Sequence, residues 1–195
     1  MEVNMKYNAF IEADGSFAFQ LGFLAKGLGD NEMHPFMNYI HIEPSDRGEG
    51  LLGIATNGQH LHLTDPLPET LVEVLELTPG YWRVLKINSK CVQIARLDDS
   101  VTTGWVYPNW RRVIPTGGPV YTTTFEGFNF TSRKHNFGEL AIFLHDFPEV
   151  TGINLTYLHA LGTGFTWNAE WYGAQKALRL TERDRTAVIM PLQLN

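Results

Sequence analysis

The sequence predicts an α+β fold made of two related units. A strand, a helix and a run of strands occur in that order twice, and an Asn-Gly turn joins two apolar segments in the first copy. A Gly- and Pro-containing joint at residues 116–119 separates the copies. We therefore expect domains at residues 1–116 and 119–195, the second smaller, each with antiparallel sheet and helices on one face.

The first unit is expected to open with a strand at residues 4–12 and a helix at residues 16–28. Ser16 suits the helix N-cap, and Gly27 and Gly29 suit its end. Three-to-four spacing places one apolar stripe on the helix, formed by Phe17, Leu21, Leu24 and Leu28.

Strands make up most of the remainder of this unit. Residues 39–43 alternate polar and apolar side chains, and residues 51–63 predict a hairpin around Asn57 and Gly58. Further strands are expected at residues 71–77, 92–97 and 101–106, with a short helix at 79–85.

The second unit is expected to contain an extended segment at 121–131 and a helix at 154–161 that Asn154 caps. Residues 135–147 fit either a strand or an amphipathic helix. Closing strands are expected at 165–171, 174–180 and 186–194.

The composition is that of an ordinary globular protein, with 44% apolar and 18% charged residues among 195. No run approaches the roughly 18 apolar residues of a membrane span, and the N-terminus lacks a secretory pattern. One cysteine, Cys91, fits a reducing compartment, so a cytoplasmic location is expected. A net charge of −6 argues against a general nucleic-acid coat.

Three separated segments carry the functional signal. They are I-A-T-N-G-Q-H-L at 54–61, Y-P-N-W-R-R-V-I-P at 107–115 and T-A-V-I-M-P-L-Q-L at 186–194. Together they resemble the bacterial DNA polymerase III beta subunit family, the sliding clamps. In that family the segments A-T-D-G-H-R-L, F-P-D-Y-R-R-V-L-P and V-V-M-P-M-R-L build a groove for polymerase and other peptides.

The resemblance implies a DNA-clamp-like fold and a hydrophobic peptide groove. Apolar walls with adaptable methionine would receive the leucine and aromatic side chains of a peptide. The groove would be formed by Thr56, Gly58, Gln59, His60, Leu61, Pro108, Arg112, Val113, Val188, Met190, Pro191, Leu192, Gln193 and Leu194. Asn57, Gln59, His60 and Gln193 depart from the family pattern, which bears on the preferred peptide.

The resemblance also implies a non-enzymatic processivity factor that encircles duplex DNA loosely and binds polymerase and clamp loader through short peptides. It implies no cofactor, no metal and no catalytic residue. Candidates for facing DNA are Lys26, Lys86, Lys90, Arg133 and Lys134, which would otherwise be solvated surface residues. Family members have three domains and close as dimers, whereas the resemblance implies that this chain has counterparts of only the middle and last domains. A homo-oligomer is therefore expected, with three copies favoured over two, and the compact chain suggests a phage source and the host cytoplasm.

Two other functions stay open. A clamp-like module could bind peptides without closing a ring. A metal-dependent enzyme could centre on His60 and His62, with Asp65 nearby, because side chains two apart on a strand share a face. The sequence has no H-E-x-x-H motif or Cys-x-x-Cys pair to support that enzyme.

Overall fold

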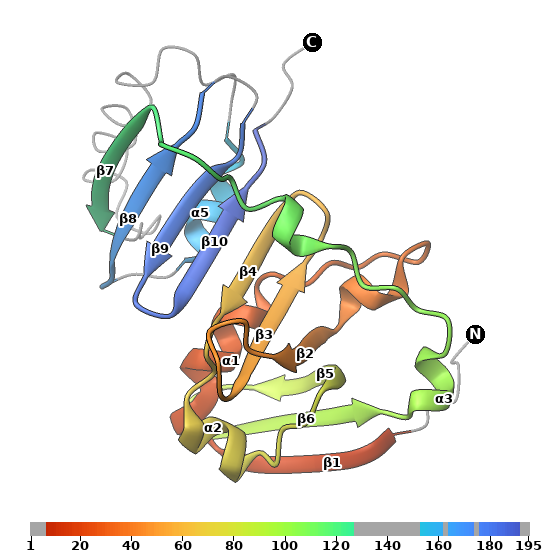
Figure 1. Cartoon of the computed structure of the whole chain (residues 1–195). Helices are drawn as coiled ribbons and strands as arrows, with labels where there is room; N and C mark the ends of the chain where they lie inside the picture. The colour runs from red at the N-terminus through yellow and green to blue at the C-terminus, as the bar shows by residue number, and fades with distance from the viewer. Residues whose placement is uncertain (1–6, 127–152, 162–163, 174–175, 192–195) are drawn as a thin grey trace. The chain divides into compact units, whose positions relative to one another are not determined.

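The computed structural model describes residues 7–126, 153–161, 164–173 and 176–191. The chain divides into two compact units, Met1–Pro108 and Asn109–Asn195 (Figure 1). This division lies earlier in the chain than the joint expected at 116–119. The α+β class is confirmed, since both units combine antiparallel strands with a few short helices. No helix within the described ranges is long and apolar enough to cross a bilayer.

The first unit contains a six-stranded sheet in the order β1-β6-β5-β2-β3-β4, and every pairing is antiparallel. Its strands are β1 (Tyr7–Asp14), β2 (Ile40–Pro44), β3 (Leu51–Thr56), β4 (His60–Thr64), β5 (Gly80–Ile87) and β6 (Cys91–Leu97). The hairpin at Asn57 is confirmed: its Oδ1 accepts from the backbone N–H of Gln59 at 2.9 Å and of His60 at 3.0 Å. Gly58 has φ +88°, which its lack of a Cβ permits.

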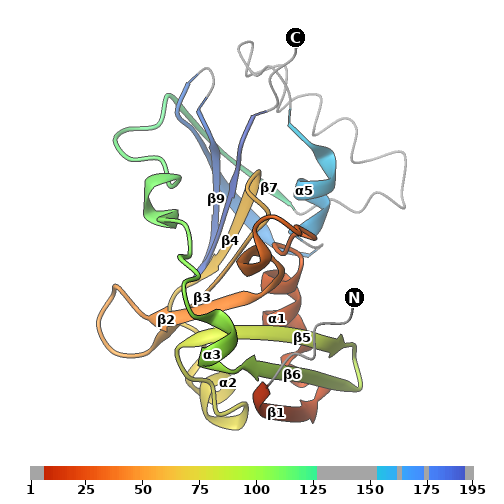
Figure 2. The same ribbon diagram turned by 90° about the vertical axis from the view of Figure 1, so that its right-hand side faces the viewer.

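The expected first helix is present in a shorter form. The 3₁₀ helix η1 (Gly15–Phe17) leads into α1 (Ala18–Ala25), which packs on β3, β4 and β5 (Figure 2). Asp14, rather than Ser16, supplies the cap, because its side chain accepts from the Ser16 N–H at 2.7 Å. Gly27 allows the chain to approach the sheet closely, since a Cβ there would lie 2.9 Å from the Cβ of His62.

Two neighbouring predictions were wrong. Residues 71–77 do not form a strand: α2 (Glu69–Val74) lies there, because Leu71 and Leu75, four apart, are both buried on one side. Residues 79–85 do not form a helix, since β5 begins at Gly80 with φ +138°. The apolar-rich sequence of 71–77 is compatible with a strand, but its two polar residues, Glu73 and Glu76, are three apart, as on one face of a helix.

The strand predicted at 101–106 was also wrong. The short helix α3 (Asp99–Thr102) begins just before it, and the Asp98 side chain caps it by accepting from the Ser100 N–H at 2.8 Å. A further 3₁₀ helix, η2 (Pro35–Asn38), precedes β2.

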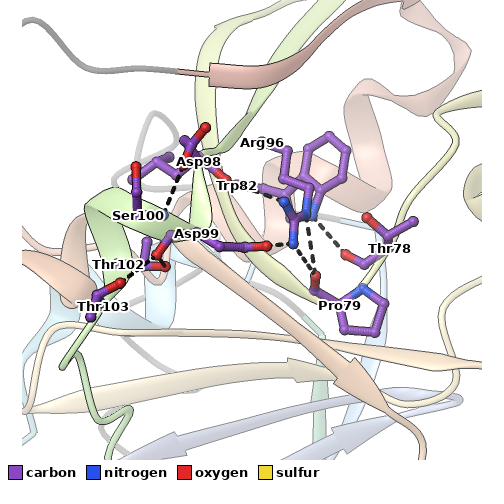
Figure 3. Close-up of polar contacts among 10 residues, drawn as sticks. Thr78, Pro79, Trp82, Arg96, Asp98, Asp99, Ser100, Thr102 and Thr103 are labelled. Atoms are coloured by element: carbon purple, nitrogen blue, oxygen red, sulfur yellow. Dashed lines mark hydrogen bonds and ion pairs between the residues drawn. The ribbon is translucent and has the colours of Figure 1, made fainter.

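Arg96 fastens α3 and the start of β5 to the sheet (Figure 3). Its guanidinium donates to the carbonyl of Pro79 at 3.1 and 3.3 Å and to Asp99 Oδ1 at 2.8 Å. Beside it, the indole N–H of Trp82 donates to the carbonyl of Thr78 at 2.9 Å. A side chain at Gly80 would meet this guanidinium at 3.0 Å, so the contact also requires the glycine.

A second core covers the sheet face opposite α1. Ile42 pairs with Gly53, and Gly53 lies against Leu24 of α1, so Ile42 faces the helix. Neighbouring residues of a strand point to opposite faces, so His41 and its cross-strand partner Tyr81 face away from the helix. There Tyr39, Tyr81 and Leu97 are buried, and Phe36, Val101, Trp105 and Tyr107 pack against them. The His41 and Tyr107 rings stack at 4.6 Å, and burial raises the pKa of Tyr107.

The second unit contains four antiparallel strands in the order β10-β9-β8-β7. They are β7 (Tyr121–Glu126), β8 (Thr166–Trp171), β9 (Leu178–Glu182) and β10 (Arg185–Ile189). β9 begins later than the expected 174–180. The predicted helix is confirmed as α5 (Leu155–Ala160), with Asn154 Oδ1 accepting from the Thr156 N–H at 3.0 Å. It lies on one face of the sheet (Figures 1 and 2). The predicted segment 135–147 lies outside the described residues.

Among the described residues of this unit, one cation is buried. Arg185 is 7% exposed, and its Nη2 lies 2.5 Å from Glu182 Oε2. Its guanidinium also lies over the rings of Phe165 at 4.4 Å and Trp167 at 5.1 Å. The Arg185 guanidinium therefore contacts both an acidic side chain of β9 and two aromatic rings at the start of β8.

Candidate functional site

A pocket of about 490 Å³ lies within the second unit. It is lined by Arg112, Val113, Ile114, Pro115, Thr116, Gly117, Gly118, Tyr172, Lys176, Ala177 and Met190. The lining unites parts of two sequence segments that carry the resemblance, since Arg112 and Val113 come from one and Met190 from the other.

Three stretches of chain build the pocket. One wall is the end of the 3₁₀ helix η3 (Trp110–Arg112) and the residues after it, another is the β8–β9 connection, and Met190 follows β10 directly. Gly117 has φ +95°, and a Cβ at Gly117 or Gly118 would meet no atom within 4 Å. The wall is therefore open at these two glycines, and a ligand has room beside them.

The pocket offers apolar surface to a ligand. Val113 and Met190 are 40% and 38% exposed, so both present apolar surface in the pocket. A methionine at this position can repack around different apolar groups because its side chain is flexible and polarisable. These two residues are the exposed large apolar side chains of the described lining.

Tyr172 is held in a fixed orientation at the pocket. Its hydroxyl donates to Glu170 Oε2 at 2.9 Å and accepts from Arg179 Nη1 at 3.4 Å. Arg179 Nε in turn lies 3.1 Å from Glu170 Oε2, so the Glu170 charge is already paired. Burial raises the pKa of Tyr172 above its ordinary value, so the phenol stays a hydrogen-bond donor to Glu170.

Of the other predicted groove residues in the second and third segments, those that the structure describes do not line this pocket. Val188 is 1% exposed within β10, and Pro191 is half-buried after it. Leu192, Gln193 and Leu194 lie outside the described residues. Pro108 ends the first unit.

The groove residues of the first segment belong to the first unit. Thr56 and Leu61 face each other across β3 and β4, and both are buried. The Thr56 hydroxyl donates to the His60 carbonyl at 2.6 Å and accepts from the Gly58 N–H at 3.1 Å. Gly58 and Gln59 are exposed at the turn. A role for these residues in peptide binding stays a prediction.

His60 and His62 complete the C-terminal end of α1. His62 Nδ1 lies 2.5 Å from the carbonyl of Phe23, and His60 Nε2 lies 3.1 Å from that of Lys26. A carbonyl only accepts, so each ring donates through the named nitrogen. Helix ends leave carbonyls without intrahelical partners, and these side chains satisfy two of them. The His62 ring also stacks on Phe23 at 4.4 Å.

This arrangement does not support the metal-dependent alternative. The two histidine rings are neighbours, 5.1 Å apart, but within the described part of the chain no group of three metal-binding side chains forms. Asp65 is occupied elsewhere, with its carboxylate 2.5 Å from the Ser45 hydroxyl and 3.5 Å from Arg47. Burial lowers the pKa of His62 to about 3, so this ring is neutral at physiological pH.

The described lysines among the DNA-facing candidates do not share one surface. Lys26 directly follows α1, which lies on one face of the sheet. Ile87 of β5 points toward this face, because its Cδ1 would lie 3.8 Å from a Cβ placed on Gly22 of α1. Lys86 precedes Ile87 in β5 and therefore points to the opposite face. Lys90 is exposed in the β5–β6 turn. Arg133 and Lys134 lie outside the described residues.

Sequence reasoning missed most of the pocket lining. Ile114 and Pro115 lie in a segment already singled out, so they were within reach. The glycines at 117 and 118 were interpreted only as a joint. Tyr172, Lys176 and Ala177 carry no sequence signal, because only the β8–β9 connection brings them to the pocket.

Comparison with known proteins places this architecture among the DNA sliding clamps. No protein-family model and no curated protein matches the chain. Solved structures of DNA polymerase III beta subunits do match over 100% of it. The beta subunit of Borrelia burgdorferi is 15% identical with a TM-score of 0.56, and that of Streptococcus pneumoniae is 13% identical with a TM-score of 0.57; the match covers 67% of each. The Helicobacter pylori beta clamp, solved with a DNA ligase peptide, is 13% identical with a TM-score of 0.52 over 68% of its length.

These matches bear out the fold that the resemblance implies. The chain is a shorter clamp-like protein that corresponds to about two thirds of a bacterial beta clamp. At 12–15% identity the likeness concerns the fold.

Proposed function

We propose that this chain is a non-enzymatic sliding-clamp protein that holds short peptides of replication proteins in the pocket of its second unit. The observation that carries the proposal is the lining itself. Arg112 and Val113 meet Met190 there, and these residues come from segments that resemble the family's peptide groove.

The chemistry of the pocket supports a peptide ligand. Val113 and Met190 present apolar surface for leucine and aromatic side chains, and Tyr172 presents a fixed polar group at the same place. The pocket thus combines apolar surface with positioned polar groups, a combination that ligand sites use to hold and orient a ligand. The Helicobacter pylori clamp was solved with a DNA ligase peptide, and the Pseudomonas aeruginosa clamp with griselimycin.

Substitution of Met190 tests the pocket. Met190→Ala removes an apolar anchor contact and is expected to weaken a peptide containing glutamine, leucine and phenylalanine by about 1–3 kcal/mol. Met33→Ala is the matched control, because Met33 is 84% exposed and lies in the first unit. Fluorescence anisotropy with a labelled peptide measures both. Equal affinity of the Met190→Ala and Met33→Ala proteins would refute the pocket as the peptide site.

The ring is the second part of the proposal. Three copies of a two-unit chain would supply six units, and the closed oligomer would surround duplex DNA loosely. Light scattering should give the mass of a closed oligomer, with three copies favoured over two. A ring should also stay on nicked circular DNA and slide off the same DNA once it is cut. A monomeric mass at every concentration would refute the closed ring and would leave the proposed peptide binding untouched.

One observation favours a second candidate, a clamp-like module that binds peptides without enclosing DNA. Lys26 and Lys86 lie on opposite sides of the first unit's sheet, so the described lysines do not form a single cationic surface. Equal retention on circular and linear DNA, together with peptide binding, would identify this module.

A further inference from the structure

The turn between β3 and β4 contains a chemically labile pair of residues. Asn57 is followed by Gly58, and this is the one Asn-Gly pair in the sequence. Asparagine is a thermolabile residue, because the backbone nitrogen of the next residue can attack its side-chain amide carbon. Glycine hinders this attack least, since it carries no side chain beside the nitrogen. Gly58 is exposed, so water reaches the turn.

The reaction at such a pair is a ring closure followed by hydrolysis. The Gly58 nitrogen loses its proton and bonds to Cγ of Asn57, and the side-chain nitrogen leaves as ammonia. The cyclic imide then takes up one water molecule. If water breaks the new bond to Cγ, residue 57 becomes aspartate, and if it breaks the original peptide bond, residue 57 becomes isoaspartate. Nothing is oxidised or reduced in either step.

The turn polarises the amide that would be attacked. Asn57 Oδ1 accepts from the backbone N–H of Gln59 at 2.9 Å and from that of His60 at 3.0 Å. Backbone donors on a carbonyl oxygen stabilise the negative charge that develops there when a nucleophile adds. These two bonds therefore favour attack at Cγ, and any protection of the pair has to act on the nitrogen.

The Thr56 hydroxyl holds that nitrogen. The Gly58 N–H donates to Thr56 Oγ1 at 3.1 Å, and the hydroxyl donates its own proton to the His60 carbonyl at 2.6 Å. Thr56 is 7% exposed, so the N–H points toward a buried acceptor and away from bases in the solvent. A neutral hydroxyl is a weak base. The Gly58 nitrogen therefore keeps its proton while the hairpin is closed.

We propose that Asn57 is a deamidation site that the Thr56 hydroxyl protects while the hairpin is closed and that reacts when the hairpin opens. Isoaspartate would route the backbone through Cβ and Cγ and lengthen it at the turn. That change would disturb the position of His60, whose ring donates to the Lys26 carbonyl at the end of α1. Aspartate would keep the backbone path and add a negative charge. The inference does not depend on the proposed peptide binding.

The first experiment uses the natural protein in mildly alkaline buffer, with and without urea. After incubation the protein is digested, and chromatography with mass spectrometry measures aspartate and isoaspartate at residue 57. The folded protein should form these products at least about tenfold more slowly than the unfolded chain, because opening a hairpin of the core costs free energy. Asn57→Gln, which forms the ring less readily, gives the background.

The second experiment tests the Thr56 hydroxyl in the folded protein. Thr56→Val keeps the shape and removes both hydrogen bonds, and it should speed product formation about 5- to 30-fold, the scale of one or two lost hydrogen bonds. Thr64→Val is the matched control, because Thr64 is also buried in the hairpin but its hydroxyl has no hydrogen-bond partner among the described residues. This variant should react at the natural rate. Thr56→Ser restores a hydroxyl and should restore most of the protection.

Each outcome supports or overturns the inference. Equal rates in buffer and in urea would overturn the protection, and this comparison holds even if Thr56→Val does not fold. An unreactive residue 57 in the unfolded chain would overturn the site. Equal acceleration by Thr56→Val and Thr64→Val would assign the effect to general loosening of the hairpin and would overturn the role of the Thr56 hydroxyl.

Discussion

The hairpin end of the first unit and the pocket of the second unit both hold polar side chains, but the two regions use them differently. At the hairpin end His60 and His62 donate to carbonyls of α1, and Thr56 bonds within its own turn. In the pocket, Arg112 and Lys176 have no ion pair among the described residues. Polar groups that are internally satisfied stabilise a fold, whereas exposed charges without partners are available to a ligand. Substitutions at the hairpin end should therefore lower stability and leave peptide affinity unchanged. Substitutions in the pocket should change peptide affinity and leave stability unchanged.

The largest expected loss of stability comes from the buried cation of the second unit. Arg185→Ala leaves the mostly buried Glu182 carboxylate without its nearer partner, with only the exposed Arg183 beside it, and should lower the free energy of unfolding by about 3–5 kcal/mol. Arg183→Ala is the matched control, since Arg183 contacts the same glutamate at 3.5 Å but is 87% exposed. Urea denaturation measures both, and a loss at Arg183 as large as that at Arg185 would contradict the argument from burial.

At the hairpin end, His62→Ala removes both the bond to the Phe23 carbonyl and the stacked ring. We expect a loss of about 2–4 kcal/mol from the cavity and the unsatisfied carbonyl together. His34→Ala should change stability by less than about 0.5 kcal/mol, because this histidine is exposed. Peptide affinity of the folded His62→Ala protein should stay unchanged, and a parallel loss of affinity would remove the functional distinction between the two regions.

The same histidine gives the protein a pH dependence. Folding lowers the pKa of His62 from 6.5 to about 3. The stability that depends on the neutral His62 ring is therefore complete above pH 6.5 and is lost as pH falls toward 3. The unfolded state takes up the proton first, which costs about 1.4 kcal/mol per pH unit below 6.5. Denaturation series at pH 7.0, 6.0 and 5.0 should show a shallower acid loss in His62→Leu than in the natural protein. Identical slopes would contradict the burial of a neutral ring.

The smallest effect on stability should come from the pocket. Lys176→Ala removes an exposed charge that has no ion pair in the described chain and should change the free energy of unfolding by less than about 0.5 kcal/mol. Thermal unfolding of the variant beside Arg185→Ala makes the comparison direct. A loss above 1 kcal/mol would mean that Lys176 belongs to the structural group of cations.

The sequence predicted the fold where local signals agreed with burial. The Asn57 turn, the first helix and the Asn154 cap depend on neighbouring residues, and all three are present. The prediction was wrong for α2 and β5, where local pattern was ambiguous. The run of apolar residues at 71–77 is compatible with a strand, but Leu71 and Leu75 also lie on one side of a helix, and their burial in the structure favours the helix.

The site was predictable only in part, for a related reason. Arg112, Val113 and Met190 lie in segments with a recognisable pattern, and the structure places them around one pocket. Tyr172 and Lys176 enter through the path of a connection between strands, which no local pattern encodes. His60 and His62 illustrate the converse case, since their spacing fits a metal pair and their hydrogen bonds to distant carbonyls give them another role.

The capping of α1 by the hairpin also bears on the order in which the first unit folds. His62 lies 39 residues after Phe23 in the chain, yet it completes the end of an eight-residue helix. Isolated helices of this length are marginal in water, so α1 has little reason to persist before the hairpin arrives. The helix end and the β3–β4 hairpin should therefore form in one cooperative step, and closing the long loop between them sets the entropic cost of that step.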